Sequence, residues 1–259
     1  MVMPMKIKIL GSAVDSEFPG QQFAASYVIN ERVAIDAGSI GFQSSIAAQR
    51  RIEHLFLSHG HMDHINSLPM FLDNVYEFGS DCVSIHAPQD TLDSLRNDIF
   101  NERLWPDLVR LSAEESPFMK LFPMQAGDVV EASGLRVTAI DLDHVVPTLG
   151  FIVSDGSGSV AFVSDTAPLE SIWQMLNAVR DLKALFLESA FPTRMGWLAA
   201  KSKHLTPTLF KEGCGKLLHP VPIIAVHIKP TFRDEILKEF ESLKIPRVVI
   251  GSPDVLYEF

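Results

Sequence analysis

Short apolar runs bounded by turn residues recur along the whole chain and have the length of β-strands. They are rich in valine, isoleucine and phenylalanine, which favour strands. The turn-forming run Ser154–Gly158 separates two of them and predicts a hairpin. The predicted strands are Lys6–Leu10, Ser26–Asn30, Arg32–Asp36, His54–Ser58, Cys82–His86, Leu135–Asp141, Leu149–Ser154, Ser159–Ser164, Ala184–Glu188, Ile223–Val226 and Arg247–Ile250.

Helical patterns alternate with these runs. Pro168 and Pro207 lie in first helical turns, where a missing amide hydrogen costs no hydrogen bond. Two sheets with helices outside them would bury these elements, although periodicity alone does not separate that fold from a doubly wound sheet. Residues 88–123 carry helical patterns and few strand signals, which predicts a helical insertion between strands. The predicted helices are Ser44–Gln49, Ile65–Phe78, Asp90–Phe100, Leu169–Arg180, Pro207–Leu217 and Arg233–Leu243.

The length of 259 residues suits one large domain or two small ones. Because 47% of the residues are hydrophobic and 21% are charged, the chain can bury a sizeable core. The two cysteines, Cys82 and Cys214, lie far apart and are interpreted as buried free thiols. The chain begins with a strand pattern rather than a signal peptide, and no run approaches the roughly 18–20 apolar residues of a membrane span. We therefore expect a soluble cytoplasmic protein.

The net charge of -10 disfavours a nucleic-acid polymer as a partner, because an acidic surface repels a phosphate backbone. A small anion is still compatible with this charge, because bound metal ions can invert the local field. We therefore look for a metal site and a small substrate.

The densest chemical signal follows the apolar strand that ends at Ser58. His59, His61, Asp63 and His64 place four potential metal ligands within six residues. Alternate side chains of an extended chain point the same way, so His59 and His61 can bind one ion together. Asp63 and His64 open the next helix and can reach a second ion. This ligand set suits zinc, and manganese and iron also accept mixed nitrogen and oxygen ligands.

Two ions need more ligands than one loop supplies. His144, Asp165 and His227 each follow an apolar run, and ligands gather at strand ends in layered α/β folds. These three residues are therefore the candidates for completing the site. The remaining histidines of the apolar strands and their borders have no partner nearby in the sequence and are interpreted as structural: His54, His86 and His219.

The pattern His-x-His-x-Asp-His, followed by a lone histidine, a lone aspartate and a final histidine, resembles the metallo-β-lactamase superfamily. The resemblance runs from Leu10-Gly11 and Ile35–Gly38 to His227 and so covers nearly the whole chain. It implies a four-layer αββα sandwich of two similar halves, here one domain over residues 1–259. It also implies a first divalent ion on His59, His61 and His144, a second on Asp63, His64 and His227, and Asp165 as their bridge.

Further motifs narrow the resemblance to the phosphodiesterase branch, which includes transfer-RNA 3′-processing nucleases and class II cyclic-nucleotide phosphodiesterases. The motifs are Phe186–Phe191, Lys203–Pro207 and Val226–Pro230, with Phe100–Leu108 inside the insertion. The residues of these motifs resemble those of the class II enzymes more closely. The resemblance therefore implies hydrolysis of a 3′,5′-cyclic nucleotide, such as cyclic AMP or cyclic GMP, to the 5′-nucleotide.

Phosphodiester hydrolysis needs a nucleophile, neutralisation of charge and a proton for the leaving oxygen. A two-metal site supplies the first two. His204 lies outside the ligand set and can donate the proton if Glu188 holds it protonated. The predicted catalytic residues are Asp63, Glu188 and His204.

Three residues are predicted to contact the substrate. Lys229 lies two positions after His227, so in extended chain it points the same way and can contact the phosphate. Trp105 precedes Pro106, which biases its backbone away from helix and lets the ring project towards a nucleobase. Thr206 belongs to the same His-Leu-Thr-Pro motif as His204.

Three other functions share these residues. A transfer-RNA 3′-processing nuclease would use the same acid pair, but a basic flexible arm to grip RNA is not evident. Hydrolysis of a thioester or lactone would use the same metals. A catalytically silent binding module is the third, although it would have little need of every ligand. The sequence is also compatible with a homodimer, and it contains no membrane-binding signal.

Overall fold

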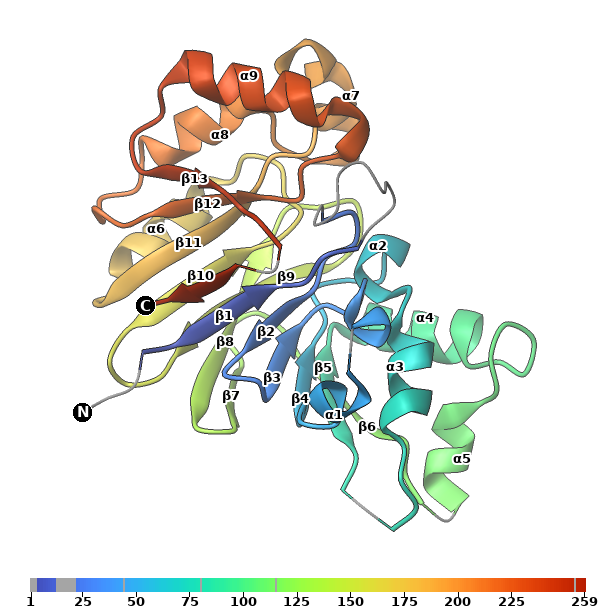
Figure 1. Ribbon diagram of the computed structural model, residues 1–259. Helices are drawn as coiled ribbons and strands as arrows, with labels where there is room; N and C mark the ends of the chain where they lie inside the picture. The colour runs from blue at the N-terminus through green and yellow to red at the C-terminus, as the bar shows by residue number, and fades with distance from the viewer. Residues whose placement is uncertain (1–3, 13–21, 44, 80, 115, 254) are drawn as a thin grey trace.

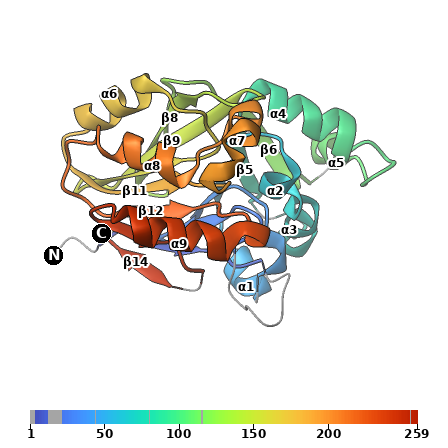
Figure 2. The ribbon, with the colours of Figure 1, turned by 90° about the horizontal axis from the view of Figure 1, so that it is seen from above.

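The computed structural model of the chain describes residues 4–12, 22–43, 45–79, 81–114, 116–253 and 255–259. Two β-sheets pack face to face, with helices α1–α5 outside the first sheet and α6–α9 outside the second (Figure 1). Figure 2 shows the same layers from above. This four-layer αββα sandwich confirms the predicted fold. Ser44, where we expected the first helix to begin, lies outside the described residues.

Within the described residues, the first sheet has the order β14-β1-β2-β3-β4-β5-β6. Strands β3 to β6 run parallel to one another, whereas the pairs β14–β1, β1–β2 and β2–β3 are antiparallel. Its strands are β1 (Lys6–Ile9), β2 (Tyr27–Ile29), β3 (Val33–Ile35), β4 (His54–Phe56), β5 (Val83–Ala87), β6 (Met119–Pro123) and β14 (Leu256–Glu258).

The second sheet repeats this plan in the order β13-β12-β11-β10-β9-β8-β7 among the described residues. Strands β10 to β13 are parallel and β7 to β10 antiparallel, with the predicted hairpin joining β9 to β10. Its strands are β7 (Val129–Ala132), β8 (Leu135–Leu142), β9 (Thr148–Ser154), β10 (Ser159–Val163), β11 (Leu182–Glu188), β12 (Ile223–Val226) and β13 (Val248–Ile250).

The helices cover the outer faces of the sheets, and none of those described is long and apolar enough to cross a membrane. The first half carries η1 (Ile40–Phe42), α1 (Ile46–Gln49), α2 (Met62–Ile65), α3 (Leu68–Val75), α4 (Gln89–Ser94), the π-helix η2 (Leu95–Ile99) and α5 (Leu108–Glu114). The second half carries α6 (Glu170–Ala178), η3 (Thr193–Met195), α7 (Gly196–Ser202), α8 (Pro207–Cys214), η4 (Pro230–Phe232) and α9 (Arg233–Leu243).

The principal core lies between the two sheets. Phe56 of β4 meets Phe151 of β9 edge to face, with 5.7 Å between ring centroids, and both rings are fully buried. Two further apolar clusters lie between each sheet and its own helices. Because the sheets are buried on both faces, the strands and the loops that follow them are held at fixed positions.

The segment 88–123 differs from the sequence prediction at its end. After helices α4, η2 and α5 it forms strand β6, which pairs with β5 and extends the first sheet. The apolar signal of β6 is weak because Lys120, Phe122 and Pro123 are exposed. Strand β14 was missed for the same reason, since Leu256 and Glu258 are exposed.

His54 and His86 have a partner that the sequence did not reveal, because they face each other across β4 and β5. Nδ1 of His54 lies 3.3 Å from Nε2 of His86, and the His86 ring stacks on Phe56. Burial, reinforced by His54, lowers the pKa of His86 to about 4, so the ring is neutral at neutral pH. Both cysteines are free as predicted, although Cys82 is only half-buried.

Gly38 is the point where three backbone segments meet beside the start of α2. A Cβ atom there would overlap the carbonyl oxygen of Asp63 and approach the amide nitrogen of Ala25 to 2.8 Å. We expect Gly38→Ala to lower the free energy of unfolding by about 1–3 kcal/mol, because neither backbone atom can rotate away. The measurement is urea unfolding of both proteins.

Gly196→Ala is the matched control, because a Cβ atom at Gly196 meets nothing within 4 Å. It should change the free energy of unfolding by less than about 0.5 kcal/mol. Equal effects of the two substitutions would contradict the close approach at Gly38.

Candidate metal centre

The residues of the predicted site come from strand ends at one edge of the sandwich. The turn between β4 and α2 carries His59 and His61, and α2 itself carries Asp63 and His64. The other three follow strands of the second sheet: His144 after β8, Asp165 after β10 and His227 after β12. The fold thus brings together all seven residues that the sequence singled out.

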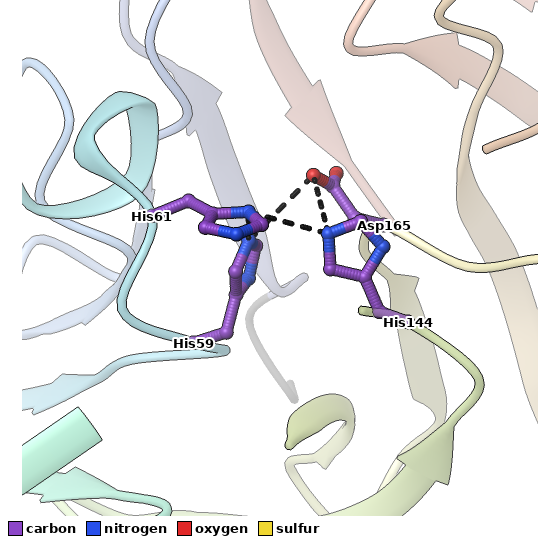
Figure 3. Close-up of side chains that lie close together, drawn as sticks. All are labelled: His59, His61, His144 and Asp165. Carbon is purple, nitrogen blue, oxygen red and sulfur yellow. Dashed lines mark hydrogen bonds and ion pairs between the residues drawn. The ribbon is translucent and has the colours of Figure 1, made fainter. Parts of the chain in front are cut away.

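Four of these side chains point at one another (Figure 3). Nε2 of His59 lies 3.0 Å from Nδ1 of His61, which lies 3.2 Å from Nε2 of His144. Oδ2 of Asp165 lies 3.7 Å from the His59 nitrogen and 3.9 Å from the His144 nitrogen. The donor atoms of this first group all lie within 4.8 Å of one another.

A second group lies beside the first and consists of Asp63, His64 and His227. Oδ2 of Asp63 lies 3.6 Å from Nε2 of His227. Asp165 reaches this group as well: its Oδ2 lies 3.4 Å from Nε2 of His64 and its Oδ1 3.4 Å from Nε2 of His227. Asp165 therefore touches both groups, and it is only 2% exposed.

The donor atoms suit a divalent metal ion. Two ligands of a tetrahedral zinc ion, each about 2.0–2.1 Å from the metal, lie about 3.3 Å apart. The closest spacings in the two groups are 3.0 and 3.2 Å in the first and 3.6 Å in the second. Buried atoms Nε2 of His64, Nε2 of His227 and Oδ1 of Asp165 have no hydrogen-bond partner. Buried polar atoms normally have partners, so these three atoms fit the role of metal ligands.

The remaining ring nitrogens are already committed. Nδ1 of His64 donates to Oδ2 of Asp36 at 2.7 Å, and Nδ1 of His59 lies 3.0 Å from Oγ of Ser58. Ser58 in turn donates from Oγ to Asp36. These contacts put the proton on Nδ1 and leave Nε2 free to bind a metal. Sequence analysis did not identify the roles of Asp36 and Ser58.

The electrostatics of the groups also favour cations. Burial lowers the pKa of His227 to about 3, so its ring is neutral and can act as a ligand. Burial opposes protonation of His64 too, but Asp165 and Asp36 outweigh it and raise the pKa of His64 well above its usual value. That shift reflects an excess of negative charge, which a divalent ion would neutralise.

Glu188 and His204 form a buried pair beside the ligand groups. Glu188 ends β11 and is fully buried, and its Oε1 lies 2.9 Å from Nδ1 of His204. The other nitrogen of His204, Nε2, lies 3.9 Å from Oδ2 of Asp165. Burial works against protonated His204, but Glu188 outweighs it and raises the pKa of His204. The pair is thus arranged to keep a proton on an imidazole that faces the centre.

The three residues predicted to contact substrate lie in different surroundings. Nζ of Lys229 lies 3.2 Å from Oδ2 of Asp63, at the edge of the second group. Thr206 is 2% exposed and its hydroxyl caps helix α8, which is a sufficient structural reason for a threonine there. Trp105 is half-buried against the apolar cluster beneath the helices of the first half. Among the described residues, no hydrogen bond, ion pair or ring contact joins Trp105 to the histidines.

Asp36→Asn tests whether the tautomer of His64 controls metal binding. Asp36 has a φ of 58°, a conformation that asparagine also tolerates, so the backbone should be kept. The new amide group would donate towards Nδ1 of His64 and push its proton to Nε2. We expect metal affinity to fall about 10–100-fold, measured by competition with a chromogenic chelator.

The control for this prediction is Asp98→Asn, at an exposed position on η2. It should bind metal like the unaltered chain. An Asp36→Asn variant of unchanged affinity would show that the hydrogen bond does not control the ligand.

Comparison with known proteins agrees with this fold. The family model of the β-lactamase superfamily domain matches residues 31–242. A probable 3′,5′-cyclic-nucleotide phosphodiesterase of Yersinia pestis is 27% identical over 71% of this chain and 59% of its own length. A ribonuclease Z of Azobacteroides pseudotrichonymphae is 28% identical over 58% of this chain and 52% of its own length. The chain thus spans little more than half of these relatives.

Among solved structures, unliganded yeast PDE1 superposes with a TM-score of 0.80 over 100% of both chains, at 17% sequence identity. That likeness concerns the fold, which is the two-sheet sandwich described above. The family model covers most of the chain, and all seven convergent residues, from His59 to His227, lie within the residues that it matches. This chain belongs to the metallo-β-lactamase superfamily.

Proposed function

We propose that the chain is a metal-dependent phosphodiester hydrolase whose substrate is a 3′,5′-cyclic nucleotide such as cyclic AMP or cyclic GMP. The observation that carries this proposal is the buried Glu188–His204 pair, which faces two adjoining groups of metal-binding side chains. The similarity to a probable cyclic-nucleotide phosphodiesterase supports the substrate class.

In this proposal His59, His61 and His144 hold one divalent ion and Asp63, His64 and His227 hold the other. Asp165 bridges them, since its two oxygens face both groups. Zinc is the expected metal because imidazole dominates the ligand set, and manganese or iron could take its place. Bound ions would supply an activated water molecule and neutralise charge on the phosphate.

The protein side chains then perform the proton transfer. Hydrolysis joins the water oxygen to phosphorus and breaks one P–O ester bond, which leaves an alkoxide. Nε2 of His204 gives its proton to that alkoxide, while Glu188 stabilises the imidazolium before transfer through the 2.9 Å contact with Nδ1. Asp63 contributes as a metal ligand, and its carboxylate also contacts the ammonium group of Lys229.

Lys229 is proposed to contact the substrate phosphate. Its ammonium neutralises Asp63 at 3.2 Å. A cation bound to Asp63 takes over that neutralisation, so the ammonium becomes available for a negatively charged ligand. Stacking of a nucleobase on Trp105 remains a prediction. The tryptophan could belong to the same chain or to a second copy of the chain in a homodimer.

A transfer-RNA 3′-processing nuclease is the second candidate, because two of the matched relatives are ribonucleases Z. The net charge of -10 works against it. We propose a small substrate and a cytoplasmic location. Hydrolysis of a thioester or a lactone at the same metal centre is a further alternative.

The test is an assay of the purified chain with zinc or manganese against cyclic AMP, cyclic GMP, a transfer-RNA precursor, a thioester and a lactone. Metal content is measured in parallel and should be about two equivalents per chain. Release of 5′-nucleotide is the expected result. Turnover of neither cyclic nucleotide with both ions bound would refute the proposed substrate.

His204→Ala should slow turnover of a cyclic nucleotide about 10²–10⁴-fold while both ions stay bound, because the leaving alkoxide loses its proton donor. The loss should shrink for a nitrophenyl diester, whose leaving oxygen needs no proton. Initial rates on both substrates and elemental analysis give the answer.

His219→Ala is the matched control, since His219 lies before β12, at the end of that strand away from the centre. It should leave both rates unchanged. Equal losses on the two substrates in His204→Ala would mean that His204 orients or binds substrate instead, and loss of metal would make it a ligand.

A further inference from the structure

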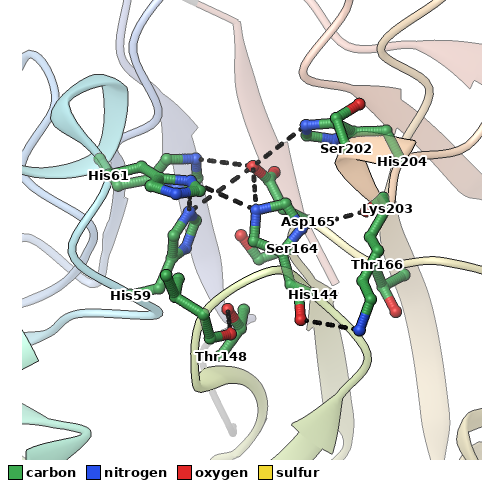
Figure 4. Close-up of polar contacts among 12 residues, drawn as sticks. His59, His61, His144, Thr148, Ser164, Asp165, Thr166, Ser202, Lys203 and His204 are labelled. Carbon is green, nitrogen blue, oxygen red and sulfur yellow. Dashed lines mark hydrogen bonds and ion pairs between the residues drawn. The ribbon is translucent and has the colours of Figure 1, made fainter. Parts of the chain in front are cut away.

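Three loops carry the parts of the centre that belong to the second sheet. The loop after β8 carries His144, the loop after β10 carries Asp165, and the loop between α7 and α8 carries His204. These loops are far apart in sequence but lie side by side in Figure 4. A metal ligand and a proton donor on separate loops need contacts that fix their relative positions, because a displacement of about 1 Å already impairs catalysis.

The first two loops are joined by two hydrogen bonds from backbone amides. The amide of Asp143 donates to Oγ1 of Thr166 at 3.2 Å, and the amide of Ala167 donates to the carbonyl of Asp143 at 2.7 Å. The second loop is joined to the third through Glu188, which accepts from the amide of Thr166 at 3.1 Å and contacts His204.

Lys203 connects the third loop directly to the first. Its Nζ donates to Oδ1 of Asp143 at 2.6 Å and to the carbonyl of His144 at 3.1 Å. Its own carbonyl accepts a hydrogen bond from Nδ1 of His144 at 3.1 Å. One residue therefore grips the His144 loop from both sides, by its side chain and by its backbone.

The backbone of Lys203 is bent to make this possible. Its φ of 55° and ψ of 59° lie in the left-handed region, where a lysine is uncommon and strained. That conformation ends α7 and turns the carbonyl towards the His144 ring. The bond fixes the proton on Nδ1 and leaves Nε2 of His144 facing the first ligand group.

We infer that Lys203 is a positioning residue, which locks the imidazole of His144 and ties that metal ligand to the loop of the proton donor His204. The inference rests on the proposed metal centre but not on which ester is hydrolysed. It assigns Lys203 no contact with substrate. The salt bridge with Asp143 is partly exposed, so its contribution to folding is small and its effect should appear at the metal.

The experiment uses Lys203→Met, which removes both contacts of the ammonium and keeps a side chain of similar length. Zinc affinity is measured by competition with a chromogenic chelator. We expect one of the two ions to bind about tenfold more weakly, because the loop that carries His144 loses both contacts of the ammonium and only the carbonyl of residue 203 still holds the ring, while the melting temperature of the metal-free protein stays unchanged. A merely structural lysine would lower that temperature and spare the metal.

Three further variants sharpen the result. Lys201→Met, at an exposed position on the same helix, should behave as the unaltered chain. Asp143→Asn should weaken the same ion, and the double variant Lys203→Met with Asp143→Asn should be little worse than either single one, because the two side chains act as a unit. Lys203→Arg, which keeps the cation, should restore most of the affinity.

The outcomes separate the two proposals. If the unaltered chain binds no metal, both the centre and the role of Lys203 are overturned. If it binds two ions and Lys203→Met binds them as tightly as Lys201→Met, only the role of Lys203 is overturned. Additive losses in the double variant would likewise show that Lys203 and Asp143 do not act together.

Discussion

The carboxylate of Asp165 is the constraint around which the site is built. It is almost completely buried, and its two oxygens face nitrogens of His59, His64, His144, His204 and His227 at 3.4–3.9 Å. A buried charge is tolerated only when opposite charge and hydrogen bonds compensate it. Imidazoles supply part of that compensation and leave the rest to cations. The strand ends of both sheets must therefore meet at this one carboxylate.

Three residues with an unusual backbone conformation lie at the same place, although others occur elsewhere in the described part of the chain. Asp36, Lys203 and His227 all have positive φ, at 58°, 55° and 54°. Such residues persist only where the surrounding structure holds them, and here the rigid sheets on either side do so. Each of the three aims a group at the centre: a carboxylate at His64, a carbonyl at His144 and an imidazole at Asp165.

The resemblance to a family implied the fold, whereas local geometry in the sequence indicated which side chains could converge as metal ligands. A strand followed by His-x-His-x-Asp-His places its ligands by local geometry, and the lone ligands after later strands follow from the same rule. The contacts of Asp36 with Ser58 and of Lys203 with His144 join residues 22 and 59 positions apart. No local pattern encodes such pairs. Strands β6, β7 and β14 were not predicted, because their exposed residues leave no clear apolar pattern.

The metal-binding side chains bear on the chemistry of the site, whereas the electrostatic field of the surrounding protein bears on the choice of substrate. Relatives named for a cyclic nucleotide and for RNA both match this chain, so the shared fold does not choose between them. Attraction between a divalent ion and a phosphate is screened beyond about 8–10 Å at physiological salt. Within that radius, bound divalent ions would outweigh the local carboxylates. The chain as a whole carries a net charge of -10, which works against the further phosphates of a polymer, whereas a cyclic diester has no further phosphate to repel.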